Sequence, residues 1–232
     1  MLKPGGSAIV TGAGSGIGRA IAHALAQHGT RVTLVGRDAA RLRAAAPPDA
    51  AILAADVTEA GGRARIAGAA GTALDVLVHS AGAYRRDAVA ALDEAAWQDM
   101  AAVNLHGPLL LTSACLNQLR AARGQVVFIN SSAAWQQAGA GMAAYAGTKA
   151  ALRAATDALR AEVNGDGVRV LSIFPGRTAT PMQATILAAE QRTAPAGTLL
   201  APEDIAAMVL AALMLPDTAE VTDIVMRPMR KL

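Results

Sequence analysis

Short apolar runs alternate with longer amphipathic stretches along this chain. Several runs rich in β-branched residues are short and end at glycine, proline or polar residues, which is typical of buried strands. They cover residues 7–11, 31–35, 51–54, 74–79, 125–130 and 168–174, and residues 220–226 form a final candidate. Apolar positions at helical spacing fill the intervening stretches. Strands that alternate with helices predict an α/β fold with a doubly wound parallel sheet of about seven strands and helices on both faces.

Glycine and proline positions indicate where the expected helices end. Gly107 and Pro108 lie inside a long helical stretch over residues 93–120, and proline at that point should kink or split the helix. A long connecting segment is expected over residues 177–201, and Pro202 opens the last helix. No internal repeat or linker interrupts the pattern, so a single domain over residues 1–232 is expected.

Composition narrows the class of protein. The chain is 53% hydrophobic and 17% charged, which allows a large core and argues against disorder. Cys115 is the single cysteine, so no internal disulfide can form and a reducing, cytoplasmic location is expected. No apolar window reaches the roughly 18 residues of a membrane span. The 21 basic and 18 acidic residues are scattered and aromatic residues are few, so neither a nucleic-acid nor a membrane partner is expected.

A glycine-rich loop connects the first expected strand to the first expected helix. Its sequence over residues 12–18 is G-A-G-S-G-I-G. Glycines permit a tight turn and a close approach of the backbone to a pyrophosphate, whose charge a helix N-terminus stabilises. The spacing is not the G-x-G-x-x-G of the standard dinucleotide motif. The loop therefore indicates a dinucleotide site, with a plain strand-to-helix turn as the alternative.

Tyr145 and Lys149 lie four residues apart on an alanine-rich expected helix. This spacing places both side chains on one helix face, with about 6 Å between their Cβ atoms. A neighbouring ammonium favours the phenolate form, so Lys149 should lower the pKa of Tyr145. Ser131 and Ser132 follow a strand end, where a hydroxyl can face a cleft. The set suits proton transfer to a carbonyl oxygen, although such residues also occur together by chance or as ordinary turn chemistry.

These features together resemble the short-chain dehydrogenase/reductase family over almost the whole chain. The glycine spacing of Gly12, Gly16 and Gly18 is that of the family, and Ser132 stands thirteen residues before Tyr145. The family's other landmarks match Asp56, the S-A-G of residues 80–82, Asn104, and the P-G-x-x-x-T turn formed by Pro175, Gly176 and Thr180. His79 and Ser80 replace both asparagines of the family's N-N-A-G, where contacts are mostly through the backbone.

The resemblance implies a Rossmann-like fold and an oxidoreductase that interconverts a carbonyl and a secondary alcohol. It implies that Tyr145 is the acid–base group, that Lys149 tunes it and binds the nicotinamide ribose, and that Ser132 holds the substrate oxygen. Asn104 would support a water relay. The implied cofactor-binding residues are Gly12, Ser15, Gly16, Ile17, Gly18, Arg37, Asp56, Val57, Ala81, Gly82, Tyr145, Lys149, Pro175, Gly176 and Thr180. No metal is expected, because the histidines are scattered.

The end of the second strand favours NADP(H) over NAD(H). NAD-preferring folds carry an acid here for the ribose 2′-hydroxyl, whereas this chain has Gly36 followed by Arg37, whose planar donor fork suits a phosphate. Asp38 can pair with Arg37 and weaken this preference, so NAD(H) stays possible. A non-catalytic dinucleotide-sensing regulator is the alternative from another class. An epimerase or dehydratase is a further alternative, for which the chain leaves little room.

The substrate is less well defined by the sequence. The residues expected to flank the pocket are Trp135, Met142, Met182, Ile186 and Leu187, which favour an apolar substrate of modest size but equally suit a core or a subunit contact. Arg177 can meet an anionic group or lie exposed in the loop of residues 177–201, which we expect to border the substrate. By resemblance, a homo-dimer or homo-tetramer is expected.

Overall fold

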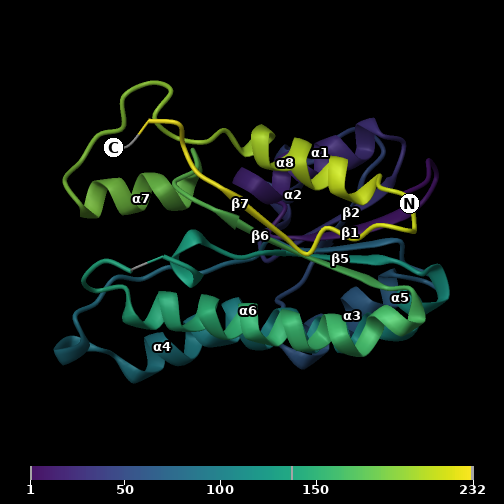
Figure 1. The fold of residues 1–232 in the computed structure, drawn as a ribbon, viewed down its shortest axis with the longest axis horizontal. Coiled ribbons are helices and arrows are strands. Elements are labelled where there is room, and N and C mark those ends of the chain that lie inside the picture. Colours follow the sequence, from purple (N-terminus) through teal and green to yellow (C-terminus); the bar gives the residue numbers. More distant parts are fainter. Residues whose placement is uncertain (1, 137, 231–232) are drawn as a thin grey trace.

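A single parallel sheet forms the centre of the computed structural model, which describes residues 2–136 and 138–230. Its strands follow the order β3-β2-β1-β4-β5-β6-β7, and every neighbouring pair is parallel (Figure 1). The strands are β1 (Ser7–Thr11), β2 (Arg31–Gly36), β3 (Ala51–Ala54), β4 (Val76–His79), β5 (Gln125–Ile129), β6 (Arg169–Pro175) and β7 (Asp223–Met226). The expected doubly wound α/β fold is therefore confirmed.

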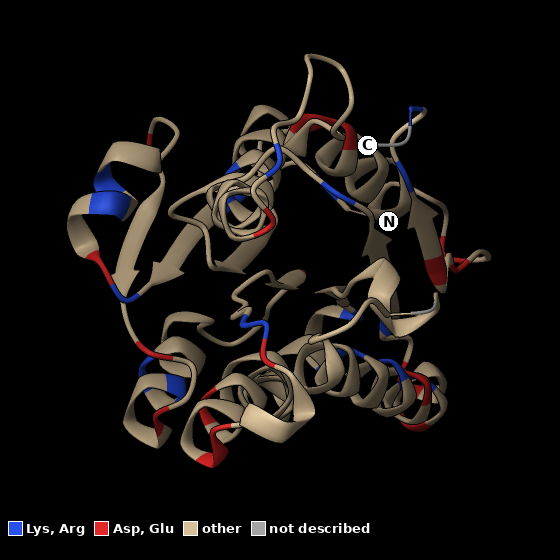
Figure 2. Cartoon of the chain, turned by 90° about the vertical axis from the view of Figure 1, so that its left-hand side faces the viewer, with Lys and Arg blue, Asp and Glu red and all other residues tan. Residues whose placement is uncertain are grey.

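Helices cover both faces of the sheet. The α-helices are α1 (Gly16–Gln27), α2 (Ala39–Ala45), α3 (Ala60–Ala69), α4 (Glu94–Ala101), α5 (Gly107–Ala122), α6 (Ala143–Val163), α7 (Pro181–Ala189) and α8 (Pro202–Leu213). Figure 1 shows α1, α2 and α8 on one face and α3, α4, α5 and α6 on the other. Lysine and arginine positions are distributed over both layers together with aspartate and glutamate positions (Figure 2).

Two apolar clusters fill the space between the sheet and its helices. One joins the sheet to α1 and α8, and the other joins it to α3, α5 and α6. The central strands β4 and β5 are buried along their whole length, which explains why they read as continuous apolar runs rather than alternating ones. Phe128 on β5 and Phe174 on β6 are fully buried. Both phenylalanines thus lie at the centre of the fold, whereas Trp97 and Trp135 are exposed.

The expected break in the long helix takes the form of a π-helical turn. Residues Ala102–His106 form this turn between α4 and α5. Pro108 has no N–H to donate to the preceding turn, and a Cβ atom on Gly107 would lie 2.9 Å from the Ala102 carbonyl oxygen. The prediction of a kink or split at Gly107 and Pro108 is confirmed. Single π-turns of this kind occur often at functional sites, and this one contains Asn104.

The segment over residues 177–201 contains a helix that the sequence pattern did not predict. Helix α7 begins at Pro181, whose fixed φ suits a first helical position. The backbone N–H of Gln183 donates to the Thr180 hydroxyl at 3.2 Å and caps the helix. Within the described part of the chain, no helix is both long and apolar enough to cross a membrane.

Candidate active site

A cavity of about 860 Å³ lies at the carboxyl ends of the strands. The residues that directly follow β1, β2, β4, β5 and β6 all line it, and these are Gly12, Arg37, Ser80, Asn130 and Gly176. The strand order reverses between β1 and β4, which is the position where open parallel sheets bind ligands. The volume of the cavity lies within the roughly 300–1,000 Å³ typical of ligand pockets.

The glycine loop requires glycine at each of its spaced positions. Gly12 has a φ of +65°, and a Cβ atom there would lie 2.6 Å from the Ala81 nitrogen. Gly16 has a φ of +52°, and its Cβ would lie 2.9 Å from a methyl carbon of Thr180. A Cβ on Gly18 would collide with the Gly12 carbonyl oxygen, so this glycine allows α1 to pack closely on the loop. The loop therefore brings backbone close to the cavity at the N-terminus of α1, a geometry suited to a pyrophosphate.

The far end of the cavity carries both basic and acidic groups. Arg37, Arg41 and Asp56 line it. Burial raises the pKa of Asp56, but hydrogen bonds from Thr58 and the charge of Arg37 outweigh this effect and hold the pKa below its usual value. The Asp38 carboxylate accepts from the backbone N–H groups of Ala40 and Arg41, so it caps α2. No ion pair between Asp38 and Arg37 is present among the described residues.

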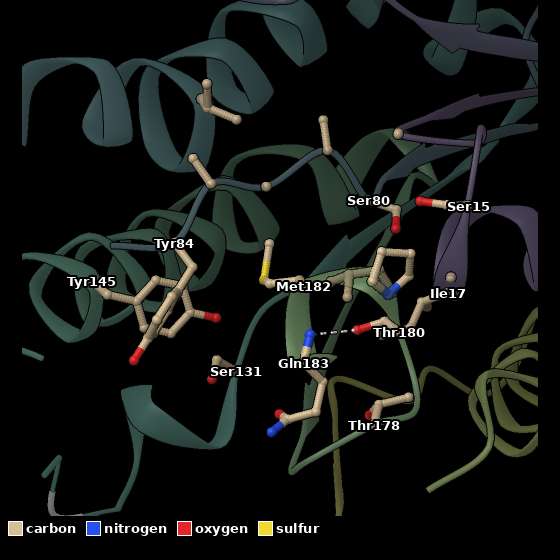
Figure 3. Close-up of a pocket in the computed structure, with 18 of the residues that line it drawn as sticks. Ser15, Ile17, Ser80, Tyr84, Ser131, Tyr145, Thr178, Thr180, Met182 and Gln183 are labelled. Carbon is tan, nitrogen blue, oxygen red and sulfur yellow. Dashed lines mark hydrogen bonds between the residues drawn. The ribbon is translucent and has the colours of Figure 1, made fainter. Parts of the chain in front are cut away.

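Tyr145 lies at the opposite end of the cavity, near the start of α6. Burial raises its pKa, a hydrogen bond with the Ser131 side chain lowers it, and the neighbouring Tyr84 raises it. The rings of Tyr84 and Tyr145 meet edge to face with centroids 5.0 Å apart, and Figure 3 shows Ser131 beside them. The overall shift is upward, and Lys149 is not among its causes, so the lowering of this pKa by Lys149 stays a prediction.

Lys149 is fully enclosed one helical turn after Tyr145. Its ammonium donates to the Ile129 carbonyl oxygen at 3.0 Å, at the end of β5. Burial lowers the pKa of Lys149 to about 8, since a charged ammonium is poorly solvated there. The hydrogen bond to the Ile129 carbonyl oxygen fixes the Lys149 ammonium at the floor of the cavity.

The two serines are placed differently in the site. A hydrogen bond from Ser131 is among the causes that lower the pKa of Tyr145, and none from Ser132 is. Ser131 is still extended, and its hydroxyl caps the short 3₁₀ turn Ser132–Ala134 by accepting from the Ala133 N–H at 3.1 Å. Ser132 also lines the cavity, but it belongs to that turn. Both hydroxyl-bearing residues therefore border the cavity, and the role of Ser132 stays a prediction.

Asn104 is buried beneath the cavity and does not line it. Its side-chain oxygen accepts from the Ala83 N–H at 2.9 Å, and its amide nitrogen donates to the Ala83 carbonyl at 2.9 Å. The same nitrogen also lies 3.2 Å from the Thr148 hydroxyl on α6. Asn104 therefore fixes the cavity wall at Ala83, next to Tyr84.

Most of the residues predicted from the sequence lie together in this one cavity. All of the predicted cofactor-binding residues line it except Gly18, as do Ser132, Tyr145 and Lys149. Met142, Met182 and Ile186 also line it, whereas Trp135 and Leu187 do not. Trp135 instead packs edge-on against Phe174, with Arg153 over its ring. His79 is buried below the cavity, donating to or accepting from Thr112 at 2.7 Å, and burial lowers its pKa to about 3.

Several cavity residues had no signal in the sequence pattern. Tyr84 and Glu190 stand in connecting segments, and Arg41 lies on a short helix without a motif. The amide nitrogens of Asn130 and Gln183 are buried and have no hydrogen-bond partner among the described residues. Unpaired buried donors are rare in folded proteins, and here both belong to residues that line the cavity. No group of residues suited to a metal ion occurs in the described part of the chain.

Comparisons with known proteins agree with this arrangement. Residues 7–191 match the short chain dehydrogenase family. An uncharacterized oxidoreductase of Staphylococcus aureus is 33% identical over 229 residues, which cover 95% of this chain and 96% of the relative. An alcohol dehydrogenase of Thermococcus sibiricus, solved with 5-hydroxy-NADP, has a TM-score of 0.87 at 28% identity and covers 97% of each chain. A metagenomic short-chain oxidoreductase solved with NADP has a TM-score of 0.82 at 30% identity, with coverage of 98% and 99%.

The parallel sheet is open, and its glycine loop lies where the strand order reverses. Tyr145 and Lys149 on α6 line the same cavity as this loop. These features together are typical of a Rossmann-like oxidoreductase. The chain belongs to the short-chain dehydrogenase family. The resemblance read from its motifs is therefore confirmed.

The hydrogen bond between Ser131 and Tyr145 can be tested by titration. The chain has only two tyrosines, so Tyr84→Phe leaves Tyr145 as the single phenol that titrates. In that background Ser131→Ala should raise the pKa of Tyr145, because a bond that favours the phenolate is lost. Ser132→Ala is the matched control and should leave the titration unchanged. Phenolate absorbance against pH gives the midpoints, and a larger shift from Ser132→Ala would show that the serines are wrongly assigned.

Proposed function

We propose that this protein is an NADP(H)-dependent oxidoreductase that interconverts a carbonyl and a secondary alcohol, with Tyr145 as the acid–base group. The observation that supports this function best is the meeting of three groups in one cavity. The Tyr145 phenol, its Ser131 partner and the buried Lys149 ammonium share this cavity with the glycine loop. Two structural neighbours were solved with NADP or 5-hydroxy-NADP.

The cavity residues fit a nicotinamide dinucleotide. The loop of residues 12–18 and the N-terminus of α1 would hold the pyrophosphate, with the Ser15 hydroxyl unused by any helix cap. Asp56 would accept from the adenine, and Thr180, Pro175 and Gly176 line the opposite end, where the nicotinamide would lie. When bound, the cofactor supplies or accepts the hydride, and the protein supplies position and charge.

Tyr145 would exchange a proton with the substrate oxygen. Burial raises the pKa of Tyr145 above a usual value that already lies well above neutral pH, so the phenol is protonated and can donate during carbonyl reduction. Ser131 would hold the substrate oxygen beside the phenol, and Ser132, the serine expected from motif spacing, would line the wall next to it. Lys149 would hydrogen-bond the nicotinamide ribose while its bond to Ile129 keeps the ammonium in place. Asn104, on the π-helical turn, would act as a positioning residue. Its two hydrogen bonds to the Ala83 backbone would hold the wall of the cavity.

Replacement of Tyr145 by phenylalanine tests the acid–base role. The ring stays and only the ionisable oxygen is lost, so turnover should fall by about 100- to 10,000-fold while NADPH affinity stays within a few-fold. Steady-state rates with a panel of ketones and alcohols, together with an NADPH binding titration, measure both quantities. A variant that kept more than about a tenth of the parent rate would exclude this role. A parent that binds NADPH but reduces no carbonyl would favour a dinucleotide sensor instead.

The cofactor preference rests on Gly36 and the two arginines at the end of the cavity. Arg37 and Arg41 are both exposed there, and Asp38 is engaged in capping α2. One charge-assisted hydrogen bond contributes roughly 1.5–3 kcal/mol, so kcat/KM should favour NADPH over NADH by about ten- to a hundred-fold.

The variant Gly36→Asp should reverse this preference, because a carboxylate there binds a 2′-hydroxyl and repels a 2′-phosphate. A Cβ atom at this position would lie 3.3 Å from a methyl carbon of Leu42, a side chain that can adjust. The variant Gly36→Ala is the control for the added Cβ and should keep the NADPH preference. Comparison of kcat/KM for both cofactors decides, and equal efficiencies in the parent would rule the preference out.

A further inference from the structure

One carboxylate ties together three segments at the substrate end of the cavity. Glu190 follows α7 and accepts from both terminal nitrogens of Arg177, at 2.8 and 3.0 Å. It also accepts from Arg86, in the segment after β4, at 3.1 Å. The Glu190 side chain is only 14% exposed, and the hydrogen bonds from Arg177 hold its pKa below the usual value. The cluster is therefore ionised at neutral pH.

The cluster holds two guanidinium groups against one carboxylate, which leaves a surplus positive charge. Arg177 and Glu190 line the cavity together with Tyr84 and Tyr145, whereas Arg86 does not line it. Burial raises the pKa of Tyr84, and the charges of Arg86 and Arg177 oppose this shift while Glu190 adds to it. Tyr84 in turn meets Tyr145 edge to face. The surplus charge thus lies close to the phenol that would exchange the proton.

Arg177 has donors left after its pairing with Glu190. A guanidinium carries five N–H groups, and Glu190 takes two of them. Arg86 is more fully used, because its Nε also donates to the Ala140 carbonyl at 3.0 Å. Asp99 lines the cavity too, but it is exposed on α4, where solvent screens its charge. Among the arginines of the described chain, Arg177 is therefore the one that lines this end of the cavity with donors left for a ligand.

We infer that the substrate is a hydroxy acid or oxo acid whose carboxylate binds the Arg177 N–H groups that Glu190 leaves free. A planar guanidinium held on one edge by Glu190 presents its other donors in a fixed direction, which suits a carboxylate. Glu190 is a positioning residue in this arrangement, because it touches Arg177 and not the substrate. The inference names the substrate class of the proposed function and rests on it.

Matched pairs of substrates separate charge recognition from size. Oxidation of 2-, 3- and 4-hydroxy acids with short chains is compared with oxidation of the corresponding carboxamides, which have nearly the same shape but no charge. In the parent, kcat/KM for at least one acid should exceed that for its carboxamide by about ten-fold or more. In Arg177→Gln this ratio should fall by roughly 10- to 100-fold, mainly through the KM of the acid. Arg120→Gln removes an arginine of a surface ion pair with Asp166 and should leave the ratio unchanged.

A double-variant cycle distinguishes direct contact from net charge. In Glu190→Gln the amide oxygen still accepts a hydrogen bond from Arg177 and holds the guanidinium, while the negative charge that competes with the substrate is lost, so the acid-to-carboxamide ratio should not fall. The double variant Arg177→Gln/Glu190→Gln restores the cluster's net charge but not the guanidinium, so the ratio should stay as low as in Arg177→Gln. Recovery of the parent ratio in the double variant would overturn the inference. Equal losses for acid and carboxamide in Arg177→Gln would also overturn it, because the ion pair would then only fasten α7.

Failure of this inference is distinguishable from failure of the proposed function. Suppose that carboxamides or neutral alcohols are turned over in a Tyr145-dependent reaction without preference for any acid. The inference of a substrate carboxylate would then be wrong, while the proposed oxidoreductase function would stand. Absence of turnover for every acid, carboxamide and neutral alcohol with either cofactor would contradict both the carboxylate inference and the proposed function.

Discussion

The reversal of strand order between β1 and β4 is the constraint on which the rest of the structure depends. The chain leaves β1 for α1 on one face of the sheet and leaves β4 for α4 and α5 on the other (Figure 1). Consequently the segments that follow the neighbouring strands meet around one cavity at the carboxyl ends of these strands. A glycine at position 12 is required at this point, because the next wall, at Ala81, lies too close for a Cβ atom.

Burial shifts the pKa values of the two central groups of the site. It raises the pKa of Tyr145 and lowers that of Lys149 to about 8, and the Lys149 ammonium donates to the Ile129 carbonyl oxygen. Helical spacing predicted correctly that both side chains reach the same cavity. It did not predict the sign of the pKa shift, because desolvation depends on how closely surrounding segments pack and not on the distance along a helix.

The sequence pattern predicted the features that depend on regular helices and strands. It did not predict the contacts that depend on the conformation of the connecting segments. The parallel sheet, the interrupted helix at Gly107 and the glycine loop follow from periodicity and from the special conformations of glycine and proline. The choice between Ser131 and Ser132 depends on where an extended strand turns into a 3₁₀ helix, which motif spacing does not specify. The contact between Arg177 and Glu190 depends on α7, a helix inside a proline-containing segment that showed no periodic pattern.

A crystal structure with bound NADP tests the central claim most directly, namely that one cavity holds the dinucleotide with its reactive end at Tyr145. The pyrophosphate should lie on the loop of residues 12–18, the 2′-phosphate should contact Arg37, and the nicotinamide ribose should lie within hydrogen-bond distance of Lys149. A dinucleotide bound outside this cavity would contradict the claim. A dinucleotide bound in the opposite direction, with adenine beside Tyr145, would contradict it equally.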